Sequence, residues 1–167
     1  MALTVFVGNS ENRLDSKNRL SIPAGFREIL KRLSSPTEPL QLYASPDLDP
    51  YSGDSIIQCY SEAKITKLEE EKLTLDPFHP RHIEIRGLQS LVRPLAIDGE
   101  GRVQLPDGLR DWLGITDTVA VVGTGDSFYF SSPEAFTLRR ERELRETKER
   151  FATLRQARLT AQAGGGS

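Results

Sequence analysis

The stretch Leu14–Leu30, LDSKNRLSIPAGFREIL, decides the fold, because Ile97–Leu113 repeats its pattern as IDGEGRVQLPDGLRDWL. Six positions are identical between the copies: Asp15/Asp98, Arg19/Arg102, Pro23/Pro106, Gly25/Gly108, Arg27/Arg110 and Leu30/Leu113. The aliphatic positions match as well, for example Leu20 with Val103. Because the matching residues occur in the same order in both copies, the repeat indicates one supersecondary unit that is used twice.

Each copy predicts a strand, a polar turn, a second strand and a short helix. In the first copy Leu20–Ile22 alternates apolar and polar residues, and Pro23 ends that strand. Phe26, Ile29, Leu30 and Leu33 then follow at helical spacing. Further elements are predicted around the two copies: strands at Leu3–Val7, Leu40–Tyr43 and Ile56–Tyr60, a helix at Ser61–Thr74, a hairpin at Thr118–Phe130 and a long helix that starts at Pro133.

The sequence therefore predicts an α+β fold, with a pseudo-symmetric β-rich body and a long C-terminal helix. We divide the chain into a first repeat (6–60), a connecting helix and linker (61–90), a second repeat (91–136), a charged C-terminal helix (137–163) and a flexible tail (164–167).

Composition narrows the classes of function. Hydrophobic residues make up 37% of the 167 residues. The sequence contains no run of about 20 apolar residues, the length that a membrane-spanning helix needs. The start of the chain does not resemble a secretory signal, so we expect a cytoplasmic protein. Cys59 is the single cysteine, which excludes an internal disulfide and a thiolate metal cage. His79 and His82 lie beside prolines and are interpreted as loop histidines, so no metal or other cofactor is expected.

The net charge of −2 hides two basic segments. Arg13–Arg32 holds six basic and two acidic residues, and Thr137–Arg158 holds eight basic and four acidic residues, so each segment carries +4. Local potential rather than average charge governs attraction to nucleic acid. Both segments are thus candidates for such contact.

The two Asp-x-x-x-Arg turns carry the candidate site. Asp15 and Asp98 can accept hydrogen bonds from backbone N–H groups of their own turns. Asn18 and Gly101 tolerate a left-handed backbone, so each turn would aim its arginine in a fixed direction. Arg19 and Arg102 can either pair back with the aspartates as structural staples or point outward to phosphate or a guanine edge.

The surroundings favour the first turn for nucleic acid. Arg13, Lys17, Arg27, Lys31 and Arg32 are close to it in sequence, whereas the second turn lies near Glu100, Asp107 and Asp111.

These residues resemble the MraZ family of bacterial transcriptional regulators. The similarity extends from Phe6-x-Gly8 through both repeats to Val121-Val122-Gly123-x-Gly125-Asp126-x-Phe128 and Ser132-Pro133-Glu134, most of residues 6–138. It implies two AbrB-like swapped-hairpin units in one body. It also implies a homo-oligomeric ring that binds direct repeats in promoter DNA, usually to repress the division and cell-wall gene cluster, and so a nucleoid-associated protein.

The resemblance also assigns roles to residues. Arg19 is the first candidate for DNA contact, with Lys17 and Arg13 as phosphate partners, while Asp15 orients the turn. Arg102 and Asp98 form the matched second pair, with an auxiliary or structural role. The chain departs from the family pattern at Asn18, where the family usually has glycine, and at Arg93-Pro94-Leu95, where an acidic residue is absent.

An enzyme and a protein-interaction module are the two other classes of function that the sequence bears on. No acidic residue lies in a recognisable arrangement with His or Ser, so an enzyme is not expected. An antitoxin-like or protein-interaction module is the alternative, although two copies in one chain argue against it. The C-terminal helix is interpreted as a solvated helix that docks its apolar edge on the body or on a neighbour; direct DNA contact is the second interpretation.

Overall fold

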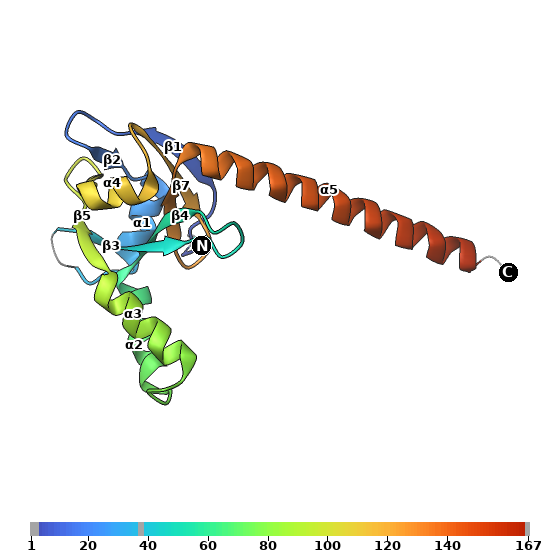
Figure 1. The fold of residues 1–167 in the computed structure, drawn as a ribbon, viewed down its shortest axis with the longest axis horizontal. Helices are drawn as coiled ribbons and strands as arrows, with labels where there is room; N and C mark the ends of the chain where they lie inside the picture. Colours follow the sequence, from blue (N-terminus) through green and yellow to red (C-terminus); the bar gives the residue numbers. More distant parts are fainter. Residues whose placement is uncertain (1–3, 37–38, 166–167) are drawn as a thin grey trace. The chain divides into compact units, whose positions relative to one another are not determined.

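The computed structural model describes residues 4–36 and 39–165, and its α+β architecture is confirmed (Figure 1). The chain forms one compact unit that ends at Pro133 and a second that begins at Glu134. The elements are β1 (Asn9–Arg13), β2 (Arg19–Ser21), α1 (Ala24–Arg32), β3 (Gln41–Leu48), β4 (Ser55–Tyr60), α2 (Glu62–Leu73), α3 (Pro80–Leu91), β5 (Arg93–Ala96), β6 (Arg102–Gln104), α4 (Asp107–Leu113), β7 (Thr118–Gly123), β8 (Phe128–Ser131) and α5 (Pro133–Gly164).

The main sheet has six strands in the order β1-β7-β8-β4-β3-β5, all antiparallel to their neighbours. The order is symmetric: counted inward from the two edges, β1 and β5, β7 and β3, and β8 and β4 are counterparts in the two repeats. The strand before the first turn, β1, pairs with β7 of the second repeat, and β5 pairs with β3 of the first. The repeats therefore exchange strands, and neither could complete its half of the sheet alone.

A two-stranded sheet of β2 and β6 lies at the centre of this symmetry. Leu20 pairs with Val103, which is its counterpart in the repeat. Both side chains are fully buried in the main core. Phe6, Phe26 and Phe128 pack in the same core with ring centroids 4.9–5.3 Å apart. Burial of this apolar cluster from both repeats holds the two turns in one rigid frame.

Helices α2 and α3 form a hairpin beside the sheet, seen in green in Figure 1. Ser61 caps α2 as predicted, since its Oγ accepts a hydrogen bond of 3.1 Å from the N–H of Lys64. Leu68 and Ile85 pack with Tyr60 in a second, smaller core. The sequence pattern of Arg81–Leu91 mixed helical and strand periods, and the structure resolves it as helix α3.

Helix α5 spans 32 residues, or about 48 Å at 1.5 Å per residue. Most of its length consists of exposed side chains. Arg139 donates from Nε to Glu143 Oε1 over 3.1 Å, an i,i+4 pair that supports an exposed helix.

Two sequence predictions about strands were wrong. Leu3 lies outside the described residues, and of Thr4–Val7 only Phe6 pairs, in an isolated bridge to Gly125; the first strand is instead Asn9–Arg13. The strand predicted at Leu40–Tyr43 runs on to Leu48 through Pro46. This proline is tolerated because β5 pairs only with Gln41–Ala44, which leaves β3 without a second neighbour at Pro46.

Candidate nucleic-acid interface

The first turn is closed by the side chain of Asp15. Its Oδ1 accepts hydrogen bonds from the backbone N–H groups of Lys17 and Arg19, both at 2.9 Å. Its Oδ2 accepts one from Nε of Arg19 at 2.7 Å. Asn18 has the left-handed backbone predicted for it, with φ of 60°. Both carboxylate oxygens are thus used inside the turn, and the guanidinium group of Arg19 is fixed through its Nε.

The second turn reproduces this geometry. Asp98 Oδ1 accepts from the backbone N–H groups of Glu100 and Arg102 at 2.9 and 3.0 Å, and its Oδ2 accepts from Nε of Arg102 at 3.1 Å. Gly101 takes the position of Asn18 with φ of 80°. The structural-staple interpretation of Asp-x-x-x-Arg is therefore correct for the Nε of both arginines.

Each turn is also hydrogen-bonded to the residue that follows the opposite strand of the β2–β6 ribbon. The N–H of Ile22 donates to the carbonyl of Gly101, and the N–H of Leu105 donates to the carbonyl of Asn18, both at 2.9 Å. These two bonds are counterparts under the repeat and flank the Leu20–Val103 pair. The turns lie at opposite ends of the short antiparallel β2–β6 ribbon, because Arg19 pairs with Gln104 and Arg102 pairs with Ser21. The side chain of Arg102 nevertheless reaches the first turn, and its Nη1 lies 3.7 Å from Asp15 Oδ2.

The two arginines differ at their terminal nitrogens. Arg102 Nη2 lies 3.3 Å from Glu100, and its Nη1 lies near Asp15. Among the residues that the structure describes, no group makes a hydrogen bond to either terminal nitrogen of Arg19. The side chain of Arg19 is 29% exposed, so these nitrogens keep access to solvent. The first turn therefore offers donors that the second turn has already used.

Proteins of nearly the same length are similar to this chain over almost all of it. A protein of Gluconobacter oxydans is 34% identical over 162 residues, which cover 96% of this chain and 93% of the relative. A protein of Caulobacter vibrioides is 33% identical over 165 residues, 98% of this chain and 99% of the relative. Both are named transcriptional regulator MraZ. This chain belongs to the MraZ family. No family model matches it.

In this MraZ-family chain both turn aspartates are firmly ionised. The hydrogen bond from the backbone N–H of Arg19 lowers the pKa of Asp15 below its ordinary value, and the N–H of Arg102 does the same for the pKa of Asp98. The charged side chains of the two turns, taken with Arg27, sum to +1, with four cations and three anions: Lys17, Arg19, Arg27, Arg102, Asp15, Asp98 and Glu100. The surface around the two turns is thus only weakly basic.

Arg27 was placed with the first turn by its sequence position, but the structure places it against the second. Its Nε donates to the carbonyl of Ile22 over 3.0 Å, and a Cβ added to Gly101 would lie 2.5 Å from its Cζ. Only glycine at position 101 leaves room for this guanidinium group. Arg110, the counterpart of Arg27 in the second repeat, donates in the same way to the carbonyl of Leu105 at 3.3 Å.

The remaining two candidate cations have different surroundings. Arg13 makes an ion pair of 2.9 Å with Asp117, and its hydrogen bond lowers the pKa of Asp117. Part of its charge is therefore already balanced inside the protein. Lys17 is exposed, and within the described part of the chain its ammonium group has no ion-pair or hydrogen-bond partner.

The described residues offer little for a metal site, a reactive thiol or a membrane-spanning helix. In residues 4–36 and 39–165, no group of three His, Cys, Asp or Glu side chains is placed to hold a metal ion. Burial raises the pKa of the Cys59 thiol well above its ordinary value, which opposes formation of a thiolate. None of the described helices combines the length and the apolar character needed to cross a bilayer.

Proposed function

We propose that this MraZ-family chain is a sequence-specific DNA-binding transcriptional regulator without enzymatic activity. The observation that carries the proposal is the pair of unbonded terminal nitrogens on Arg19, at a guanidinium group whose direction is fixed by Asp15. Such a fork matches the O6 and N7 acceptors of guanine in the major groove. The names of the relatives support a role in transcription.

The neighbouring cations supply the contacts that carry no sequence information. Lys17 is exposed near Arg19, and Arg27 of α1 lies against the second turn. Both can meet phosphate oxygens and set the register of the turn on the duplex. Arg102, held by three carboxylates, acts in an auxiliary role that supports the first turn.

A net charge of only +1 at this surface favours a multivalent assembly. Counterion release grows with the number of phosphates that are neutralised, and one chain offers about two such contacts. A homo-oligomeric ring that presents several copies to direct repeats adds these contacts along the DNA. We propose that the targets are promoter repeats of the division and cell-wall gene cluster, that binding represses them, and that the protein acts in the cytoplasm at the nucleoid.

Fluorescence anisotropy with the gene's own promoter duplex and a shuffled duplex of equal composition tests this proposal. We expect the promoter duplex to bind tighter by a factor on the order of 10³. Affinity should fall with salt along a slope of about −1.8 for each subunit engaged, which corresponds to two phosphates. Equal affinity for both duplexes would remove the proposed sequence-specific function.

Repression is tested separately with a promoter fused to a reporter gene. Loss of the protein should raise reporter output, and supplying it in excess should lower that output. An antitoxin-like or purely protein-binding module would leave the reporter unchanged.

A further inference from the structure

An acidic surface with exposed apolar side chains lies at the turn between β3 and β4. Residues 33–63 contain five acidic residues and no lysine or arginine. Leu48 and Tyr51 are 52% and 82% exposed at this turn. Trp112 of α4 joins them, because its Nε1 donates to the carbonyls of Ile56 and Asp47 at 2.9 and 3.3 Å. We call this surface the acidic tip and define it as Asp47, Leu48, Tyr51, Asp54, Asp111 and Trp112.

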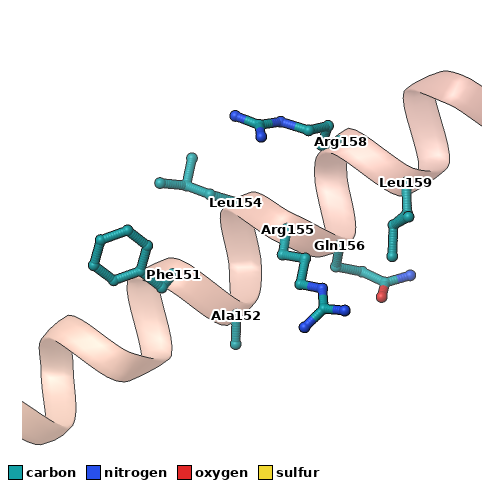
Figure 2. A pocket seen from close by; sticks show the side chains of 7 residues that line it. All are labelled: Phe151, Ala152, Leu154, Arg155, Gln156, Arg158 and Leu159. Atoms are coloured by element: carbon teal, nitrogen blue, oxygen red, sulfur yellow. The ribbon is translucent and has the colours of Figure 1, made fainter.

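A surface of the opposite character lies on the last part of α5. From Arg150 to Gly164 the helix carries three arginines and no acidic residue. Figure 2 shows Phe151, Leu154 and Arg158 above the helix axis and Arg155 and Leu159 below it. At 3.6 residues per turn, all of these positions fall within one half of the helix circumference. Phe151 and Leu154 are 68% and 65% exposed. We call this surface the basic stripe and define it as Arg150, Phe151, Leu154, Arg155, Arg158 and Leu159.

The two surfaces complement each other in charge and in apolar content. The acidic tip carries three carboxylates and three apolar or aromatic side chains, and the basic stripe carries three guanidinium groups and three apolar side chains. Two tips, or two stripes, would bring two sets of three like charges together, which is unfavourable. Arginine also packs well on the faces of tyrosine and tryptophan.

We propose that the basic stripe of one copy docks on the acidic tip of a second copy of this chain. Phe151 and Leu154 pack against Leu48, Tyr51 and Trp112, and the arginines pair with the surrounding carboxylates. Because the two surfaces differ, the contact is heterologous: each copy uses one tip and one stripe, and the copies form a ring if the rotation between them closes and an open filament if it does not. The inference rests on the proposed function only for the expectation that the copies close into a ring.

Charge reversal tests the contact by light scattering after gel filtration at low ionic strength, without DNA. We expect the wild-type protein to be larger than its 18.6 kDa monomer. Arg155→Glu with Arg158→Glu should yield monomers, and so should Asp47→Lys with Asp111→Lys. Combining all four changes in one chain should restore assembly, since the charges are again opposite.

Matched controls carry the same charge changes elsewhere. Arg142→Glu with Arg145→Glu alters the same exposed helix away from the stripe, and Glu11→Lys with Glu70→Lys alters exposed positions of the body. Both controls should keep the wild-type mass. A monomeric wild-type protein, or reversal variants with the wild-type mass, would overturn the inference.

A mixing experiment distinguishes a heterologous contact from any symmetric one. Phe151→Ser with Leu154→Ser removes the stripe, and Leu48→Ser with Tyr51→Ser removes the tip. Each variant alone should be monomeric, while the mixture should form a complex of twice the monomer mass and no larger species. Absence of a complex on mixing would contradict the proposal. Because DNA is absent throughout, these results are independent of whether the promoter duplex binds.

Discussion

At the scale of the residue, the turn aspartates convert two short loops into rigid supports for arginine. Asp15 and Asp98 each accept two backbone N–H groups and one Nε, and this leaves the terminal nitrogens as the variable part of the site. In the second turn Glu100 and Asp15 lie near those nitrogens, whereas in the first turn the terminal nitrogens have no hydrogen-bond partner among the described residues. One difference between otherwise equal turns therefore decides which arginine is available to a ligand.

The backbone of Asn18 gives a first prediction. A left-handed conformation costs a β-branched residue roughly 1–2 kcal/mol, and it costs glycine nothing. Asn18→Gly should leave the free energy of unfolding within about 0.5 kcal/mol of wild type, whereas Asn18→Val should lower it by about 1–2 kcal/mol. Denaturant unfolding followed by circular dichroism measures both. Equal stability of the two variants would mean that the positive φ at this position is not required.

The lowered pKa values of Asp15 and Asp98 predict a dependence of stability on pH. Their folded pKa values lie below the unfolded value of about 3.9, so their contribution is complete above that pH and is lost as pH falls through the folded values. Melting temperatures measured from pH 6 downward should fall less steeply for Asp15→Asn with Asp98→Asn than for wild type. Parallel curves for the two proteins would contradict this assignment.

Much of the turn chemistry could be predicted from the sequence, because it depends on residues close together in the chain. The roles of Asp15 and Asp98 and the left-handed Asn18 follow from local hydrogen-bonding capacity. The partners of Arg13 and Arg27 could not be predicted in this way. Asp117 and Gly101 are far from them in sequence, and only the exchange of strands between repeats brings each pair together.

At the scale of the element, strand exchange explains the fold. The sequence predicts most strands and helices correctly from their periods and their proline and glycine boundaries. Pairing is a property of the whole sheet, so β1 with β7 and β5 with β3 are visible only in the structure. The N-terminal strand predicted at Leu3–Val7 is absent from the described part of that range, where Phe6 forms an isolated bridge to Gly125 just after β7.

The close approach of the Phe6 backbone to Gly123 predicts opposite effects for two glycine substitutions. A Cβ at Gly123 would lie 2.6 Å from the backbone of Phe6, whereas a Cβ at Gly25 in α1 would meet nothing within 4 Å. Gly123→Ala should destabilise the protein by about 1–3 kcal/mol through the displaced segment. Gly25→Ala should stabilise it by about 0.4–1 kcal/mol. Thermal unfolding compares them, and destabilisation by both or by neither would show that this contact does not constrain the fold.

At the scale of the whole molecule, the proposed DNA binding requires assembly, because one chain offers little positive charge. The net charge of one chain is −2, and the two turns with Arg27 carry only +1. Avidity can raise affinity by a factor of 10²–10⁴ without any new contact in the site. The docking of the basic stripe on the acidic tip would provide that gain.

Removing the end of α5 should therefore weaken DNA binding although the turns remain intact. A chain that ends at Glu143 keeps the compact unit before Glu134 and the Arg139–Glu143 pair. We expect it to unfold at the wild-type temperature but to bind the promoter duplex on the order of 10² times more weakly. Full-length protein with Arg155→Glu and Arg158→Glu should show the same loss. Unchanged affinity in both would separate DNA binding from assembly.

The central claim is that Arg19, and not its counterpart Arg102, reads the DNA. Anisotropy titrations of the promoter duplex with Arg19→Ala and Arg102→Ala test it directly, with mass and melting temperature as controls for assembly and folding. Loss of a bidentate base contact costs about 1–3 kcal/mol, so Arg19→Ala should weaken binding roughly 10- to 100-fold, and Arg102→Ala should weaken it several-fold less. Wild-type affinity in Arg19→Ala, or equal losses in the two variants, would contradict the account.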